Sequence, residues 1–137
     1  MNISESKFLN KVLIETKWTD LDAYHHINNS KFFDYMTEAR SQLFFEQSLS
    51  ENAIQLVLYE CKISFKKQLK YPNKVWVEQY ISKIEGASFD LSYIIKSFKN
   101  SEIIHADAEI KMVCFDPIKN KVCRIPKNIL EIILKQN

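Results

Sequence analysis

The sequence predicts an α+β fold in which one long central helix is wrapped by a curved antiparallel β-sheet. Three observations lead to this prediction. Apolar residues recur at helical spacing between residues 30 and 46, four segments between residues 54 and 115 alternate with period two, and the links within 85–88 and 99–101 are short enough for hairpins. Because hairpins join neighbours, we expect the strands that they connect to lie side by side in the sheet.

The first elements are a strand at residues 8–16 and a helix from Ser30 to Glu46. Three consecutive residues before and at the start of the helix are good N-cap types, so its beginning is well signalled although its cap residue stays open. The apolar stripe of the helix consists of Phe32, Met36, Ala39 and Leu43. The three candidate caps are Asn28, Asn29 and Ser30.

Period-two alternation predicts four further strands, at residues 54–69, 74–85, 88–98 and 103–115. The last is the clearest, because apolar residues from Ile104 to Met112 alternate with polar ones from His105 to Lys111. One face of the sheet should therefore be buried and the other wet, with His105 on the wet face. Pro126 suits the first turn of a final helix, whose apolar residues are Ile129, Leu130, Ile133 and Leu134.

Length and composition set the broad class. The 137 residues are the size of one domain, so we expect a single domain over residues 1–137. A net charge of +2, spread along the chain, disfavours a nucleic-acid partner. Three cysteines without metal spacing predict reduced thiols and no metal site. With no apolar run long enough for a membrane span, we expect a cytoplasmic protein.

The densest group of reactive side chains is the decapeptide from Asp20 to Asn29. It holds two carboxylates, two imidazoles and two amides directly ahead of the predicted helix. Backbone N–H groups and the positive end of the helix dipole converge at such a place, which favours holding or forming an anion. Taken alone, however, an Asp-x-Asp pair before a helix is more often a turn or a cap than a catalytic site.

The segment from Trp18 to Arg40, W-T-D-L-D-A-Y-H-H-I-N-N-S-K-F-F-D-Y-M-T-E-A-R, resembles the hot-dog-fold acyl-CoA thioesterases, and within them the 4-hydroxybenzoyl-CoA thioesterase-like family. That family follows approximately the pattern D-x-D-x-x-G-H-[VI]-N-N-x-x-[YF]. The chain matches it at every position except one, where His25 replaces the usual glycine. The resemblance extends through most of the remaining chain and implies the hot-dog fold.

The resemblance also implies an activity, hydrolysis of an acyl thioester of coenzyme A or acyl carrier protein, without metal or redox cofactor. It assigns Asp22 as the catalytic carboxylate, either general base or nucleophile, and His26 as its partner, while Asp20 is expected to brace the loop. N–H groups at the helix start would polarise the carbonyl. We expect substrate contacts at His25, Asn28, Asn29 and Ser30, and candidate phosphate contacts at Arg40, Lys66, Lys67 and Lys70.

Enzymes of this kind place the active site between subunits, so the resemblance implies a homodimer or homotetramer. Two alternatives remain at this point. One is a hot-dog enoyl-CoA hydratase or dehydratase, because Asp20 and His25 have the spacing of the D-x-N-P-L-H element, although Asp22 and Ala23 stand where Asn and Pro would be. The other is a non-catalytic acyl-CoA-binding subunit that uses the same pocket.

Overall fold

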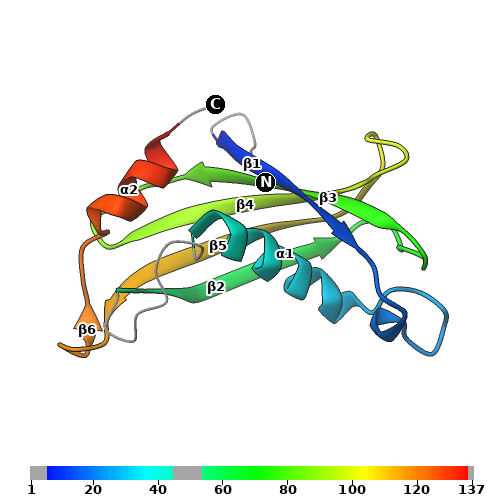
Figure 1. Cartoon of the computed structure of the whole chain (residues 1–137), viewed down its shortest axis with the longest axis horizontal. Coiled ribbons are helices and arrows are strands. Elements are labelled where there is room, and N and C mark those ends of the chain that lie inside the picture. The colour runs from blue at the N-terminus through cyan, green and yellow to red at the C-terminus, as the bar shows by residue number, and fades with distance from the viewer. Residues whose placement is uncertain (1–5, 45–53, 136–137) are drawn as a thin grey trace.

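An antiparallel sheet forms one layer of the structure, and the long helix α1 (Asn29–Phe44) lies across one of its faces (Figure 1). The computed structural model describes residues 6–44 and 54–135. Within these residues the predicted α+β architecture is confirmed: one long helix packs against one antiparallel sheet, and a short second helix covers one end.

The remaining elements lie close to their predicted places, except that the strand predicted at 54–69 ends at Phe65, so residues 66–69 are not part of a strand. The helix α1 begins one residue earlier than predicted, whereas Glu46 and the predicted loop at 48–53 lie outside the described residues. A single 3-10 turn, η2, and the two-residue strand β6 were not predicted, because neither is long enough to show a period. The bounds are β1 (Lys7–Glu15), η2 (Trp18–Asp20), β2 (Gln55–Phe65), β3 (Lys74–Ser82), β4 (Ser88–Ser97), β5 (Ile104–Asp116), β6 (Lys121–Val122) and α2 (Lys127–Leu134).

The sheet has the strand order β1-β3-β4-β5-β2, with β6 paired to β5. The predicted hairpins β3–β4 and β4–β5 are confirmed. Strand β2, however, pairs with β5 and not with the next strand in the chain, β3. Residues 66–73, which we call the crossing segment, therefore carry the chain past the ends of β5 and β4. The loop before α1 lies at this same end of the sheet, on the right in Figure 1.

The core fills the space between α1 and the inward face of the sheet. Inward side chains of β4 and β5 alternate with outward ones, as the pattern predicts, and meet the apolar stripe of the helix. At the centre of each element the inward side chains are almost completely buried: Phe32, Met36, Ala39, Leu91, Tyr93, Ile95, Ala106, Ile110 and Met112. Burial of this apolar face is the main force that holds α1 on the sheet.

One polar network lies inside this core. The hydroxyl of Tyr93 donates to the Gln79 side chain at 2.6 Å and accepts from the Arg40 guanidinium at 3.3 Å. Gln79 donates in turn to the carbonyl of Ala39 at 3.0 Å, so the network joins β3 and β4 to α1. Because Arg40 is only 5% exposed, the expectation that it meets phosphate groups at the surface is wrong. Helical spacing turns this residue towards the sheet.

The expected exposure of His105 is also wrong, since this side chain is only 5% exposed. Strand patterning alone assigns it to the face in contact with water. The pairing of β5 with β4 is irregular at this point, because Ile95 pairs with Ala106 and Lys96 with Ile104, which leaves His105 as the extra residue of a bulge. The crossing segment, however, folds over the start of β5, and the N–H groups of Lys66 and Lys67 donate to the His105 carbonyl at 2.8 and 3.2 Å. The alternation of polar and apolar residues within a strand cannot predict burial by a segment from another part of the chain.

Candidate active site

Residues 21–28, which we call the acid loop, connect η2 to α1. The loop closes on itself through an antiparallel bridge between Leu21 and Ile27 and through a 2.8 Å bond from the Asp22 N–H to the His26 carbonyl. The Asp22 carboxylate organises the turn, because its Oδ1 accepts the N–H groups of Tyr24 and His26 at 2.8 and 3.1 Å. Its Oδ2 accepts no hydrogen bond from the described residues.

The charge state of Asp22 follows from these bonds. The N–H of His26 and then that of Tyr24 hold the pKa of the Asp22 carboxyl below its usual range, outweighing a small opposing effect of desolvation. Hydrogen bonds to the charged form favour that form, so the carboxylate is ionised at neutral pH. Asp22 therefore combines one anchored oxygen with one unengaged oxygen, and serves at the same time as a turn residue and as a candidate base or nucleophile.

The second carboxylate of the motif has a different environment. Asp20 is only 6% exposed, and its Oδ2 accepts the hydroxyl of Tyr35 at 2.6 Å and the N–H of Lys17 at 3.0 Å. Its carbonyl accepts the N–H of Asn28 at 2.9 Å. These contacts close η2 on its own cap and tie it to α1 and to the last residue of the acid loop, which is the bracing role expected for Asp20.

Tyr35 was not recognised from the sequence as part of this site. Burial, and next the hydrogen bond to Asp20, raise the pKa of its hydroxyl far above the usual value, so the group stays protonated and donates to the carboxylate. A signal was present in the sequence: a tyrosine on the buried stripe of a helix needs a partner for its hydroxyl, whereas phenylalanine does not.

The start of α1 resolves which residue caps the helix. The side-chain Oδ1 of Asn28 accepts the N–H of Ser30 at 3.0 Å, and its carbonyl accepts the N–H of Lys31, so Asn28 is the cap. With Asn28 N–H bound to Asp20 and Ser30 N–H bound to the cap, the N–H of Asn29 is the one left without an acceptor among the described residues. It lies at the positive end of the helix dipole.

The two imidazoles of the motif differ in their positions. His25 is exposed and its backbone has φ 65°, in the left-handed region that glycine adopts without strain. This conformation explains why the family pattern has glycine at the position. The side chain of His26 is half-buried next to Asp22, and its backbone N–H and carbonyl both bond to that residue.

The structure does not support the Asp20–His25 pair on which the hydratase alternative was based. Asp20 is buried and its carboxylate is bound to Tyr35 and Lys17, whereas His25 is exposed on the acid loop. The two side chains therefore do not form the pair that their spacing suggested.

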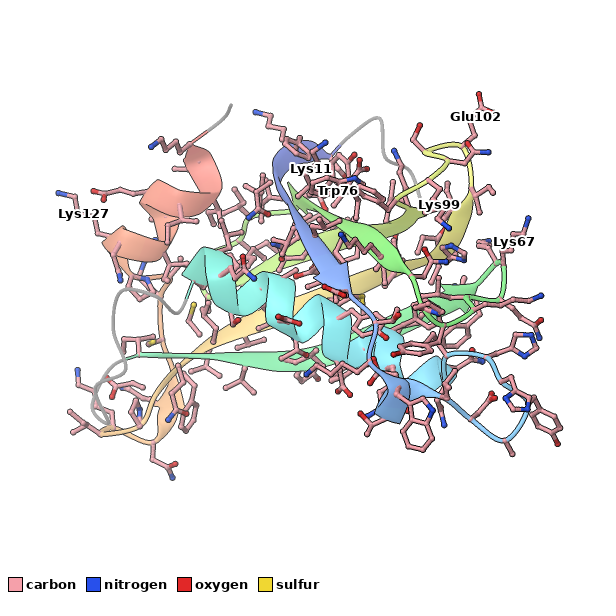
Figure 2. The ribbon with its side chains drawn as sticks, turned by 45° about the vertical axis from the view of Figure 1, so that its right-hand side comes forward. Lys11, Lys67, Trp76, Lys99, Glu102 and Lys127 are labelled. Atoms are coloured by element: carbon pink, nitrogen blue, oxygen red, sulfur yellow. The ribbon has the colours of Figure 1, made fainter. Side chains whose placement is uncertain are left out.

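The acid loop lies on the crossing segment. The N–H of Ile27 donates to the carbonyl of Leu69 at 2.8 Å, and His26 forms a bridge with Lys70. Ile27 and Leu69 are both buried, with at most 2% of their surface exposed. Figure 2 shows Lys67, from the same segment, at the end of the molecule that carries the acid loop.

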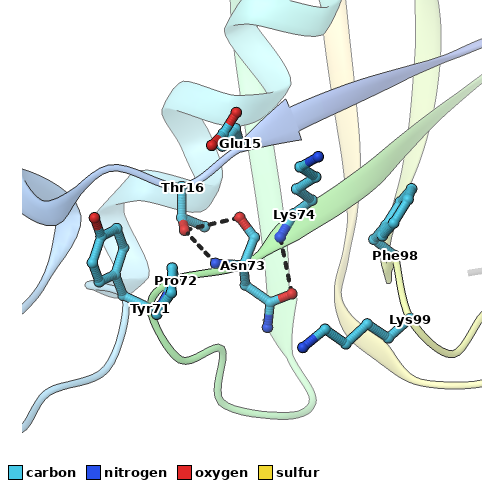
Figure 3. Close-up of a pocket in the computed structure, with 8 residues that line it drawn as sticks. All are labelled: Glu15, Thr16, Tyr71, Pro72, Asn73, Lys74, Phe98 and Lys99. Carbon is cyan, nitrogen blue, oxygen red and sulfur yellow. Dashed lines mark hydrogen bonds between the residues drawn. The ribbon is translucent and has the colours of Figure 1, made fainter.

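The far end of the crossing segment is held by Thr16, where β1 ends. The Thr16 hydroxyl donates to the Asn73 carbonyl at 3.0 Å and accepts the Asn73 N–H at 2.9 Å (Figure 3). These bonds form one wall of an open pocket of about 330 Å³. The pocket contains none of the predicted site residues; its lining is Glu15, Thr16, Tyr71, Pro72, Asn73, Lys74, Phe98 and Lys99.

The described residues were also compared with the requirements of a metal site and of a membrane-spanning helix. Among residues 6–44 and 54–135, no group of three or more His, Cys, Asp or Glu side chains is arranged to hold a metal ion. No helix in the described part of the chain combines the length and the apolarity that crossing a membrane requires.

The family follows from a match over most of the chain. A model of the thioesterase-like superfamily matches residues 16–133, which include η2, the acid loop, α1 and the whole crossing segment. The chain belongs to this superfamily. The long-chain acyl-CoA thioesterase FadM of Escherichia coli strain K12 is 26% identical to it over 109 residues, which cover 75% of this chain and 80% of FadM.

Solved structures agree with the thioesterase-like assignment in fold. The PA2801 protein from Pseudomonas aeruginosa has a TM-score of 0.86 and 25% identity, over 93% of this chain and 99% of that one. Slr0204, a 1,4-dihydroxy-2-naphthoyl-CoA thioesterase from Synechocystis, has a TM-score of 0.79 and 18% identity, over 92% of this chain and 97% of that one. The hot-dog architecture that the motif implied is therefore confirmed.

The left-handed backbone at His25 predicts how stability responds to substitution there. We expect His25→Gly to leave the free energy of unfolding unchanged or to raise it by up to about 1 kcal/mol, because glycine adopts this conformation without strain. His25→Val should lower it by about 1–2 kcal/mol, since a β-branched side chain is a true outlier at positive φ. Urea unfolding of wild type and the two variants measures both effects. A valine variant as stable as wild type would contradict the left-handed backbone conformation at residue 25.

Proposed function

We propose that the protein is an acyl-CoA thioesterase whose active site is the acid loop together with the first N–H groups of α1. One observation carries the proposal: in a member of the thioesterase-like superfamily, Asp22 is ionised and lies seven residues before Asn29, and neither Asp22 Oδ2 nor the helix N–H of Asn29 has a hydrogen-bond partner among the described residues. These are the two groups that thioester hydrolysis requires, one to deliver oxygen and the other to stabilise an oxyanion.

The proposed chemistry assigns one task to each group. The thioester carbonyl oxygen accepts the N–H of Asn29 at the positive end of the helix dipole, which stabilises the negative charge that develops there. Asp22 Oδ2 either removes a proton from an attacking water or attacks the carbonyl carbon itself. In the first route the water adds to the carbonyl, the coenzyme A thiolate leaves and the acid is formed directly. In the second route the thiolate leaves as a mixed anhydride forms on Asp22, and a water then hydrolyses the anhydride to release the carboxylic acid and restore Asp22. His26, next to Asp22, is the proposed proton carrier.

Substrate contacts at His25, Asn28, Asn29 and Ser30 remain part of the proposal, with Asn28 acting through its cap of the helix. The acyl group is proposed to be carried by coenzyme A, as in FadM, with acyl carrier protein as the alternative carrier. We propose that no metal or redox cofactor takes part, because hydrolysis needs only the groups named above. All three cysteines are free thiols, which supports a cytoplasmic location.

We also propose that two copies of the chain pair through β2, as a homodimer or as half of a tetramer. This strand is an edge of the sheet, paired only with β5, so one row of its backbone groups is free among the described residues. It exposes apolar side chains at Val57 (43%), Tyr59 (67%) and Phe65 (48%). Pairing with a second copy satisfies the backbone groups and covers part of the apolar surface.

Substitution of the catalytic carboxylate tests the proposed activity. We expect wild type to release free thiol from at least one member of a panel of short, medium, long and aromatic acyl-CoAs. Asp22→Asn should retain the fold and lower kcat about 100-fold or more, because the side chain no longer acts as a base or nucleophile. The matched control is Asp34→Asn, an exposed aspartate on α1 paired with Lys31 at 3.6 Å, which should turn over at the wild-type rate. Near-normal turnover by folded Asp22→Asn would contradict the assignment.

The pH dependence of kcat/KM separates the two candidate bases. If ionised Asp22 is the active form, activity is lost only as the pH falls through the pKa of Asp22, which lies below the value of about 3.9 usual for aspartate. We therefore expect a flat profile down to about pH 4, with circular dichroism as a check that the fold persists. An acid limb near the histidine value of about 6.5 would make His26 the essential base instead.

Sedimentation velocity tests the pairing through β2. Wild type should sediment as a dimer or tetramer, and the double variant Val57→Lys/Tyr59→Lys should shift towards monomer, because two charges would be buried without partners. Leu13→Lys is the control, since Leu13 is 39% exposed on β1 at the opposite edge of the sheet. A monomeric wild type at micromolar concentration would overturn this part of the proposal.

A further inference from the structure

The crossing segment is held at three places, and at one of them the anchor is a buried imidazole that has no task in the proposed chemistry. Thr16 bonds to Asn73 at the far end, and Leu69 and Lys70 meet the acid loop in the middle. At the near end the anchor is His105, the first fully buried residue of β5.

His105 holds the crossing segment with three bonds. Its carbonyl accepts the N–H groups of Lys66 and Lys67, and its imidazole Nδ1 lies 3.0 Å from the carbonyl oxygen of Lys67. A carbonyl oxygen only accepts, so Nδ1 must carry the hydrogen of this bond. In the neutral ring, Nε2 is then left with a lone pair.

That second nitrogen shows that the imidazole does more than fill space. His105 Nε2 is buried and has no hydrogen-bond partner among the described residues. A buried polar atom without a partner disfavours the folded state, and a phenyl ring of similar size would avoid this cost. The feature that an apolar ring lacks is the Nδ1–H, whose acceptor within the described part of the chain is the Lys67 carbonyl.

We propose that His105 is a positioning residue for the active site, acting through the crossing segment on the acid loop. Its Nδ1–H fixes Lys67, which fixes the carbonyl of Leu69 two residues later. That carbonyl receives the N–H of Ile27, the last buried residue before the helix start. Asp22 and the N–H of Asn29 lie on either side of Ile27 in the chain, so their spacing depends on this contact. This inference rests on the proposed function of those two groups.

Isosteric substitutions isolate the Nδ1–H bond. His105→Asn places an amide N–H where Nδ1 was and removes the unpartnered Nε2. His105→Gln places its amide at the Nε2 position and loses the bond to Lys67. His105→Phe keeps the ring and loses both nitrogens. Two experiments are carried out on each variant well below its melting temperature: steady-state kinetics, which gives kcat and KM per folded active site, and NMR, which gives the hydrogen-exchange rate of the Ile27 N–H.

We expect the Phe and Gln variants to lower kcat about tenfold or more with KM within about twofold of wild type, because small displacements of reacting groups act mainly on the chemical step. Exchange at Ile27 should accelerate about tenfold or more in the same variants. His105→Asn should have kcat and Ile27 exchange near the wild-type values. If His105→Phe does not fold, the comparison of Gln with Asn decides the question.

Two results would overturn the inference. One is a folded Phe or Gln variant with wild-type kcat and wild-type exchange at Ile27, which would reduce His105 to a packing residue. The other is an Asn variant as impaired as the Phe variant, which would show that the Nδ1–H bond is not the feature that matters. If wild type releases no thiol from any acyl-CoA, the proposed function fails, but Ile27 exchange still tests the anchoring by His105.

Discussion

The strand order of the sheet forces the chain to cross from β2, at one edge, to β3, near the other, and the acid loop depends on that crossing. The crossing segment passes the ends of β5 and β4 and presents the carbonyl of Leu69 to Ile27. Without this contact, the acid loop would bond mainly to itself and to η2. A loop that carries reactive groups needs a rigid support outside itself. In this protein a connection between two strands provides that support, held at its two ends by His105 and Thr16.

The two aspartates of the motif show how position in the fold separates roles that spacing leaves equivalent. Asp20 is buried, and its carboxylate is bound by the Tyr35 hydroxyl and the Lys17 N–H, so it has little contact with solvent. Asp22, two residues later, points outward, and backbone N–H groups of its own loop keep it ionised. Each carboxylate accepts two hydrogen bonds on a single oxygen, so what separates the two residues is burial: Asp20 is shielded from solvent, whereas Asp22 is partly exposed.

The start of α1 combines structural and chemical tasks in three consecutive residues. Asn28 caps the helix and is itself fixed by Asp20, so the direction of the first helical N–H groups is set by the same aspartate that braces the loop. The cap accepts the N–H of Ser30, and the N–H of Asn29 has no acceptor in the part of the chain that the structure describes. A strained backbone at His25 lies within the same short loop. The loop turns sharply enough for Asp22 to bond to His26, and a left-handed residue between them is one way to make so tight a turn.

Local pattern was enough to predict the long helix, the strands and the motif, because helical and strand periods and capping residues are written in neighbouring positions. The family resemblance added the hot-dog fold and pointed to Asp22. Three features depended on tertiary structure. The burial of His105 comes from a segment about forty residues away in sequence, the Tyr35–Asp20 bond joins a helix to a turn, and the pairing of β2 with β5 sets the path of the crossing segment. Each is a contact between residues distant in the chain, and a period or a motif reports only on neighbours. The sequence alone therefore determined the elements and the reactive groups, whereas the packing of distant segments decided which of those groups are anchored and which are left free to react.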